Sequence, residues 1–263
     1  MDGIINKEVF TQLKEPQLYH YYEPEPGLFI AESLKVAQRA LDAGYQPVAV
    51  LADRQKADRE FAPFLAACGE IPVFLEPEEE LQTMVGYHLT GGLLCAMRRR
   101  ALPPCRLLLL DARHIAVLEH ITNPTNVGAI IRNAAALQVD AVVLTADSSD
   151  PLCRRAIRVS MGTVFQVPWT VLGPEEWPDE GMTTLADMGY ARIALALTPD
   201  AVGIEQVRDQ THARLAMILG SEGDGLTPQT IASCDAVARI PMRAGVDSLN
   251  VAAASAVAFW TLA

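Results

Sequence analysis

The chain has 263 residues, of which 50% are apolar and 20% charged, so we expect a folded globular protein. It carries 32 acidic and 21 basic side chains, which gives a formal net charge of −11. This balance argues against a protein that binds nucleic acid through its overall charge, although a local basic patch could still serve.

The cysteines and the two ends of the chain predict the cellular compartment of the protein. Five scattered cysteines form no CxxC pair and five histidines form no metal-binding pattern, which predicts reduced thiols and no metal. The start, MDGIINKEVF, lacks the features of a signal peptide, and the apolar run VAAASAVAFWTLA is too short to cross a bilayer. We therefore expect a cytoplasmic protein with no membrane partner.

The first hundred residues predict a small α/β unit. In FIAESLKVAQRALDAGYQPVAVLA, apolar spacing predicts a helix over residues 32–43, ended by Gly44, and a strand over 47–51. A second strand over 71–75 precedes a helix with an acidic first turn. The segment RRRALPPCR, residues 98–106, breaks the pattern and predicts a boundary between domains 1–103 and 107–263.

After this boundary, short apolar runs alternate with helical segments: IAVLEHI, DAVVLTA, ARIALAL, LAMILG and AVARIP. Such alternation predicts an α/β fold with a mainly parallel sheet and helices on both faces. Ligands of such sheets bind beyond the carboxyl ends of the strands. We therefore expect the functional site in the loops NPTNVG, GSEGDG and PMRAGVDSLN.

The NPTNVGAIIRNAAAL segment predicts a helix capped by Asn126 and continuing from Val127. Arg132 lies beside its apolar face, either as a solvent-facing residue or as a cation at the edge of the cleft. In the third loop, Ser248 is the expected cap of the last helix, and Asn250 in its first turn is either functional or merely solvated.

The GSEGDG loop differs from phosphate-binding loops. No Lys-Ser/Thr pair follows its glycines, and their order is GxxGxG instead of GxGxxG. Glu222 and Asp224 would also repel a phosphate. A cationic or polar ligand, such as an adenosine with an amino-acid sulfonium tail, fits better; the alternative is a tight turn without a ligand.

In this order, NPTNVGAIIR, GSEGDG and IPMRAGVDSLNVAAA resemble the three motifs of the SpoU (TrmH-like) RNA 2′-O-ribose methyltransferases of the SPOUT superfamily. The resemblance covers about residues 115–263, with Asn123 where aspartate is usual. It implies a C-terminal trefoil knot, S-adenosylmethionine as cofactor, and a homodimer whose active sites are completed across the interface. The first hundred residues resemble the RNA-binding domain similar to ribosomal protein L30e that many members carry.

The resemblance also implies roles for individual residues. Those matching the cofactor-binding positions are Leu219, Gly220, Ile240, Met242 and Leu249, and those matching the catalytic set are Asn126, Arg132, Glu222, Ser248 and Asn250. The implied function is methylation of a ribose 2′-hydroxyl in ribosomal or transfer RNA, with ribosomal RNA favoured. The alternatives are an RNA-binding protein without turnover and a base-modifying RNA methyltransferase.

The net acidity requires a local surface for RNA. We expect it at Arg154, Arg155 and Arg158, together with the three arginines at 98–100, because the arginine fork suits phosphate contacts. The alternative for each group is a solvated helix face.

Overall fold

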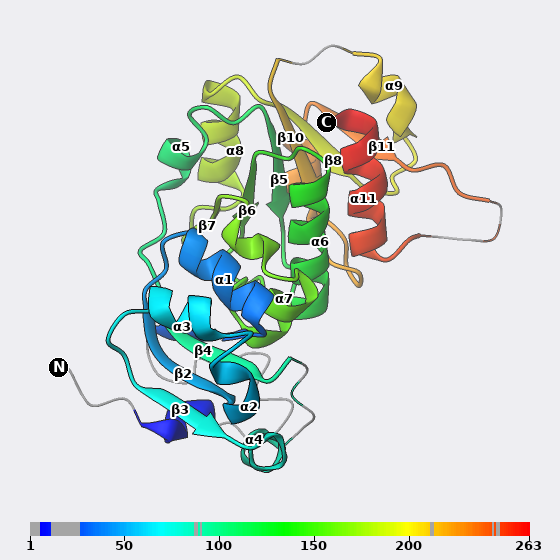
Figure 1. Cartoon of the computed structure of the whole chain (residues 1–263). Helices are drawn as coiled ribbons and strands as arrows, with labels where there is room; N and C mark the ends of the chain where they lie inside the picture. The colour runs from blue at the N-terminus through cyan, green and yellow to red at the C-terminus, as the bar shows by residue number, and fades with distance from the viewer. Residues whose placement is uncertain are drawn as a thin grey trace. The chain divides into compact units, whose positions relative to one another are not determined.

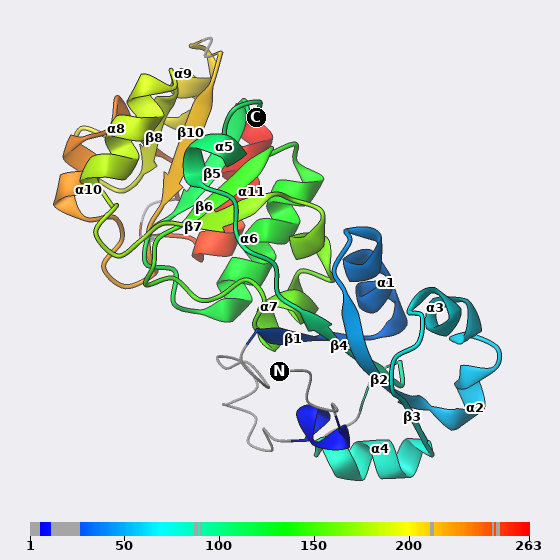
Figure 2. The ribbon, with the colours of Figure 1, turned by 90° about the vertical axis from the view of Figure 1, so that its left-hand side faces the viewer.

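The computed structural model describes residues 6–11, 27–86, 89, 91–210, 213–243, 245 and 248–263. The chain divides into two compact units (Figures 1 and 2). The first comprises Met1–Ala101 and Asp150–Gln166, and the second Leu102–Ser149 and Val167–Ala263. The sequence predicts that residues 150–166 belong with the C-terminal domain, whereas in the structure they pack within the first unit.

The first unit is built on a mixed sheet with strand order β1-β4-β2-β3. Its strands are β1 (Leu28–Glu32), β2 (Pro47–Asp53), β3 (Val73–Glu76) and β4 (Leu93–Arg98). Strand β4 runs antiparallel to β1 and β2, whereas β3 is parallel to β2. Its helices are η1 (Lys7–Phe10), α1 (Leu34–Asp42), α2 (Arg54–Ala57), α3 (Ala62–Ala67), α4 (Glu78–Val85), α7 (Arg154–Val159) and η3 (Thr163–Phe165).

The start of the first predicted helix is wrong. Leu28–Glu32 forms a fully buried strand, and α1 begins only at Leu34, after Ser33 adopts a positive φ of 81°. The reason is long-range pairing. Strand β1 pairs with β4, which the sequence analysis does not predict, and this pairing overrides the local helical spacing.

The second unit contains a parallel sheet whose strand order, among the described residues, is β7-β6-β5-β10-β8-β11-β9. The five predicted runs are confirmed as β5 (His114–Leu118), β6 (Ala141–Leu144), β8 (Ala191–Leu195), β10 (Leu215–Leu219) and β11 (Ala236–Arg239). The edge strands β7 (Trp169–Val171) and β9 (Val202–Gly203) are too short to predict from periodicity.

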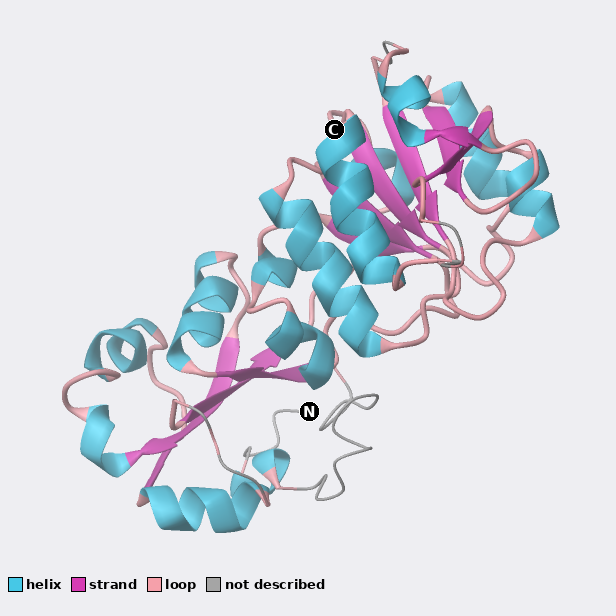
Figure 3. Ribbon diagram, turned by 90° about the vertical axis from the view of Figure 1, so that its right-hand side faces the viewer, coloured by secondary structure: helices cyan, strands magenta, loops and turns pink. Residues whose placement is uncertain are grey.

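Helices cover both faces of this sheet, as predicted (Figures 1 and 3). They are α5 (Cys105–Leu108), α6 (Pro124–Ala136), α8 (Asp179–Asp187), α9 (Ile204–Arg208), α10 (Pro228–Ala232) and α11 (Val251–Leu262). Alternate residues such as Ile115 and Val117 pack against Met182 and Leu185 of α8. On the other face α6 and α11 lie side by side, joined by Asn133, whose Nδ2 donates to the Ala252 carbonyl at 2.8 Å.

None of the five cysteines, all of them described, forms a disulfide. In the described part of the chain, every helix is too short or too polar to cross a membrane. The same residues contain no group of three or more His, Cys, Asp or Glu side chains arranged to hold a metal ion.

Helix α7 is attached to β1 through a buried ion pair. Arg154 Nε donates to Glu32 Oε2 at 3.2 Å, and the two side chains are only 11% and 5% exposed. Arg158 lies farther from Glu32, at 3.9 Å, with a side chain 52% exposed. The structure therefore differs from the predicted RNA surface at Arg154, whose side chain points into the first unit because a buried carboxylate holds it.

Removing this pair should destabilise the first unit. We expect Arg154→Ala to lower the free energy of unfolding by about 3–5 kcal/mol, because the buried Glu32 carboxylate loses its closest cation. Arg158→Ala is the matched control and should cost less than about 1 kcal/mol, since its guanidinium is half exposed and lies 3.9 Å from Glu32. Urea unfolding followed by circular dichroism measures both values. Equal effects of the two substitutions would contradict the assigned role of Arg154.

Candidate functional site

The loops at the carboxyl edge of the parallel sheet enclose a cavity of about 470 Å³. Its walls come from the segments after β8, β10 and β11 and from the start of α11. The predicted residues that line it are Leu219, Gly220, Glu222, Ile240, Met242, Ser248, Leu249 and Asn250. The structure thus brings together all five residues predicted to bind the cofactor and three of the five predicted to be catalytic.

The GSEGDG loop folds back on itself directly after β10. A Cβ atom on Gly220 would lie 2.3 Å from the Gly225 carbonyl carbon and 2.4 Å from the Leu226 nitrogen, so only glycine fits there. Gly225 has a positive φ of 71° and donates its amide to the Ser221 carbonyl at 3.2 Å. This close backbone packing fixes the loop that forms one wall of the cavity.

A single amide group joins the three motifs. Asn250 Nδ2 donates to Asn126 Oδ1 at 3.2 Å and also to Glu222 Oε1. Asn250 Oδ1 accepts the amides of Ala252 and Ala253 at 2.9 and 3.4 Å, and thereby begins α11. Its orientation is therefore fixed from both ends, because the acceptor and the donors of the amide are all engaged.

Two predicted caps differ from the structure. Asn123, not Asn126, caps α6, since its Oδ1 accepts the Thr125 amide at 2.9 Å. Asn250, not Ser248, caps α11. Each loop holds two residues that could cap its helix. Asn123 and Asn250 form the caps, and the other two, Asn126 and Ser248, line the cavities.

Asn126 and Arg132 lie outside the first cavity. Asn126 is 5% exposed and lines an adjoining cavity of about 240 Å³, which shares Ser221, Glu222 and Asp224 with the first. Arg132 lies in the third turn of α6, is exposed and lines neither cavity. Within the described part of the chain the Arg132 side chain makes no hydrogen bond or ion pair, so no described residue of the same chain fixes its orientation.

Residues 113–260 match the SpoU rRNA Methylase family, which is more than half of the chain. The chain belongs to the SpoU rRNA methylase family. The resemblance predicted from the three motifs is therefore confirmed at the level of the family, and the α/β architecture with its mainly parallel sheet agrees with it.

This SpoU-family chain has similar relatives in bacteria. An uncharacterized tRNA/rRNA methyltransferase of Mycobacterium bovis is 40% identical over 235 residues, or 89% of this chain and 80% of that protein. A 23S rRNA (guanosine-2′-O-)-methyltransferase of Bordetella pertussis is 31% identical over 146 residues, or 56% of this chain and 57% of that protein. An AdoMet-bound rRNA methyltransferase of Sinorhizobium meliloti shares the fold, with a TM-score of 0.77, 23% identity and coverage of 90% and 87%.

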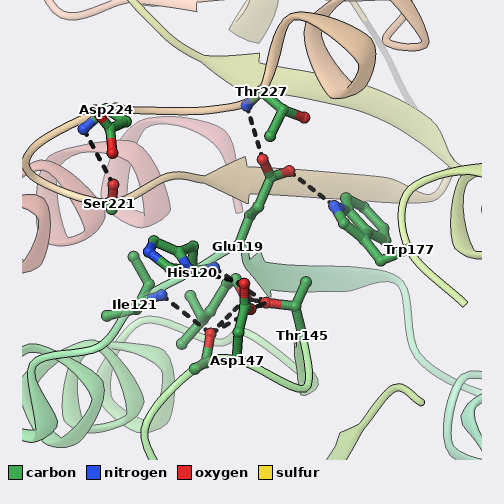
Figure 4. A network of polar contacts seen from close by, with 11 residues as sticks. Glu119, His120, Ile121, Thr145, Asp147, Trp177, Ser221, Asp224 and Thr227 are labelled. Atoms are coloured by element: carbon green, nitrogen blue, oxygen red, sulfur yellow. Dashed lines mark hydrogen bonds and ion pairs between the residues drawn. The ribbon is translucent and has the colours of Figure 1, made fainter. Parts of the chain in front are cut away.

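The same edge of the parallel sheet carries a group of residues that the sequence analysis does not predict. Glu119, directly after β5, is 3% exposed and accepts the Trp177 indole N–H and the Thr227 amide, each at 2.7 Å (Figure 4). These residues line a cavity of about 540 Å³ that shares Ser221 and Asp224 with the other two. The position of Glu119 directly after the parallel strand β5 is the sequence signal that could have identified it.

His120 has an unusual backbone next to this group. Its φ of 56° lies in the left-handed region, its amide donates to Thr145 Oγ1 at 3.0 Å, and its Nδ1 lies 2.8 Å from Asp147 Oδ2. Partial burial alone would raise the pKa of Asp147, but hydrogen bonds from Thr145 and His120 outweigh it and lower that pKa. Asp147 is therefore an ionised acceptor that orients the imidazole at neutral pH.

The loop packing leads to a prediction. We expect Gly220→Ala to lower the free energy of unfolding by about 1–3 kcal/mol, because its Cβ must displace backbone atoms of Gly225 and Leu226. Gly223→Ala is the matched control in the same loop, since its Cβ would meet no atom within 4 Å. Thermal unfolding of both variants measures the difference. A Gly220→Ala protein as stable as Gly223→Ala would show that the loop tolerates a side chain at that position.

Proposed function

We propose that this chain transfers a methyl group from S-adenosylmethionine to a ribose 2′-hydroxyl in ribosomal RNA, and with less preference in transfer RNA. The main support is the cluster in which the Asn250 amide binds Asn126 and Glu222 at the wall between two cavities. Membership of the SpoU family supports the same reaction. The relative named a 23S rRNA (guanosine-2′-O-)-methyltransferase favours ribosomal RNA as the substrate.

The 470 Å³ cavity fits S-adenosylmethionine in size and chemistry. Apolar side chains, including those of Leu195 and Ile231, offer a surface to the adenine ring, and the Glu222 carboxylate offers a countercharge to the cationic part. The cofactor, when bound, supplies a methyl group on a positively charged sulfur. Its proposed contacts are the predicted ones: Leu219, Gly220, Ile240, Met242 and Leu249.

Thr198 is a further contact for a polar ligand. Its hydroxyl oxygen is buried, and the residue lines the 470 Å³ cavity. The hydroxyl lies near enough to Asp200 to lower the pKa of that carboxyl, yet it forms no hydrogen bond of normal geometry with any described residue. A buried polar group without a partner is costly, so a ligand atom that binds it gains free energy.

Methyl transfer is an in-line displacement, so most of the catalysis comes from positioning. The fixed Asn250 amide holds one carboxylate oxygen of Glu222. The other oxygen would accept the hydrogen bond of the ribose hydroxyl and hold its proton once the methyl group has moved from the sulfur to the ribose oxygen. Ser248, which lines the same cavity, orients the ribose.

Arg132 acts from a second copy of the chain. A guanidinium stays protonated in proteins, so Arg132 stabilises the developing charge on the ribose oxygen and does not act as a base. Helix α11 supports a homodimer, because it is apolar on all sides and leaves Val257 and Trp260 37% and 78% exposed. The partner covers this face and contributes its Arg132 to the site.

The remaining assignments follow the family resemblance. Residues 1–103 act as an L30e-like RNA-binding domain, and residues 107–263 form the catalytic domain with a C-terminal trefoil knot. The cytoplasm is the compartment that we propose for the enzyme.

The first unit offers a basic hollow for the RNA backbone. A cavity of about 440 Å³ is lined by Gly44, Gln46 and the arginines Arg98, Arg99 and Arg100. Arg100 Nη1 donates to the Ala43 carbonyl at 2.7 Å and its guanidinium lies 5.3 Å from the centre of the Tyr45 ring, so it is held in place. We propose that these arginines, with Arg155 and Arg158 of α7, form the surface that binds the RNA backbone, which we call the RNA track. Arg154 is not part of it, because its side chain forms the structural ion pair with Glu32.

The reaction is tested by transfer of labelled methyl groups from S-adenosylmethionine to unmethylated ribosomal and transfer RNA, followed by digestion to nucleosides. We expect label in a 2′-O-methyl nucleoside and a loss of about 10²–10³-fold in rate for Arg132→Ala. Arg208→Ala is the control, since Arg208 is an exposed arginine that pairs with its neighbour Asp209. Label in a base would replace ribose methylation with base methylation, and no label with intact RNA binding would favour a protein without turnover.

The shared active site is tested by mixing two inactive variants, Arg132→Ala and Asn250→Ala. If Arg132 acts across the interface, a mixed dimer has one intact site, and random exchange restores about a quarter of the wild-type activity. If Arg132 acts within its own chain, no mixture regains activity.

The RNA track is tested by the salt dependence of RNA binding. We expect Arg98→Gln with Arg100→Gln to weaken binding and to lower the slope of log K against log salt by about 1 per lost phosphate contact. Arg59→Gln, an exposed arginine elsewhere in the first unit, is the control. A slope equal to that of the control would remove these arginines from the track.

A further inference from the structure

The cavity of about 540 Å³ adjoins the 470 Å³ cavity proposed for the cofactor (the cofactor cavity) and has no part in the proposed methyl transfer. Ser221 and Asp224 line this cavity, the cofactor cavity and the smaller cavity that contains Asn126. His120 lines both the small cavity and the 540 Å³ cavity. A molecule that places one part beside Asn126 and Glu222 therefore has room for its next part beside His120.

The far wall of the 540 Å³ cavity is rigid and aromatic. Glu119 accepts the Trp177 indole N–H through one oxygen and the Thr227 amide through the other, so the end of β5 and the start of α10 are both tied to the indole (Figure 4). A Cβ on Gly181 would lie 2.6 Å from Trp177 Cε3, so the ring also packs closely on α8. Such an immobile indole suits stacking with a flat ligand, because little conformational entropy is lost on binding.

The charge of the cavity selects the ligand further. Its ionisable lining residues are Glu119, His120, Asp147 and Asp224, so carboxylates outnumber the one group that can become cationic. A phosphate is repelled by this lining. A flat ligand that donates N–H groups is favoured, because carboxylates only accept hydrogen bonds.

His120, which lines both cavities, has a strained backbone. A φ of 56° favours glycine, and the hydrogen bonds to Thr145 and Asp147 offset the cost of a histidine there. Because a carboxylate only accepts hydrogen bonds, the Nδ1–H group of His120 donates to Asp147, and the imidazole so held lines both cavities. A conformation that is costly and lies between two cavities is typical of a ligand contact.

We propose that this cavity receives the base of the nucleotide that is methylated, and that it prefers bases with an exocyclic amino group, guanine first, over uracil. The inference rests on the proposed function for the position of the ribose. A ribose beside Asn126 and Glu222 then directs its base past His120 onto the Trp177 wall. Guanine offers two adjacent N–H groups to a carboxylate, whereas uracil offers one N–H group flanked by two carbonyl oxygens, which the acidic lining repels. The base must leave its stack, so the target lies in a single-stranded or opened region.

The first test measures binding without catalysis. The ¹⁵N-labelled full chain, saturated with S-adenosylmethionine, is titrated with guanosine, cytidine, adenosine or uridine, and the three indole N–H signals are followed. We expect millimolar guanosine to shift the signal of Trp177, assigned with Trp177→Phe, with cytidine and adenosine next and uridine last. Trp169 and Trp260 are internal controls, because neither lines this cavity. An unmoved Trp177 signal, or equal shifts with all four nucleosides, would overturn the proposal.

The second test measures methyl transfer by His120→Gly and Asp147→Asn. Glycine accepts the left-handed backbone, so His120→Gly removes the imidazole without adding strain. Gln138→Gly is the matched control, since Gln138 is an exposed residue with a φ of 58° that lines none of these cavities. We expect both His120→Gly and Asp147→Asn to raise the KM for RNA about 10-fold and to weaken base preference, with unchanged affinity for S-adenosylmethionine.

The two tests separate this proposal from the proposed function. Variants that match the wild type in KM and in the base of the methylated product would overturn the base cavity while ribose methylation stands. If the wild type methylates no RNA, the proposed function fails, and the nucleoside titration still decides whether the cavity binds a base.

Discussion

The Asn250 side chain is the interaction on which the functional end of the second unit depends. Its oxygen begins the last helix, and its NH₂ group binds both the motif-one residue Asn126 and the glycine-loop residue Glu222. An aspartate could cap the helix but could donate to neither partner, and a serine would be too short to span them. One amide group therefore fixes the start of α11, the position of the glycine loop and the orientation of the Glu222 carboxylate.

The parallel sheet makes this junction possible. Strands β5, β10 and β11 run in the same direction, so their following loops meet at one edge although they are far apart in the sequence. Asn133 holds α6 against α11 on the same face, which keeps the two helices that carry Asn126 and Asn250 in register. The site is thus built from a rigid sheet edge and two clamped helices, with the tightly folded glycine loop between them.

Much of the second unit could be predicted because its signals are local. Each central strand is a short apolar run ended by a turn, and each of the three motifs is a single contiguous segment of the sequence. The first unit shows where local signals end: the sequence around Glu32 has helical spacing, but pairing with β4 makes it a strand. Arg154 looks solvent-facing for the same reason, since its partner Glu32 lies 122 residues away.

The functional edge shows a second limit. The sequence predicts that the acid and histidine after β5 continue the strand, whereas the structure turns them into the wall of a cavity through Trp177, Thr145 and Asp147. The sequence could not decide either which of Asn123 and Asn126 caps α6, because their side chains have the same capping chemistry. Only the tertiary contacts decide between residues of equal local propensity.

The glycine loop after β10 is a common wall, and this has a thermodynamic consequence. Ser221 and Asp224 line the cavity of about 470 Å³ and both of its neighbouring cavities. A ligand that displaces this loop in one cavity changes the free energy of binding in the next, and linkage makes the effect reciprocal.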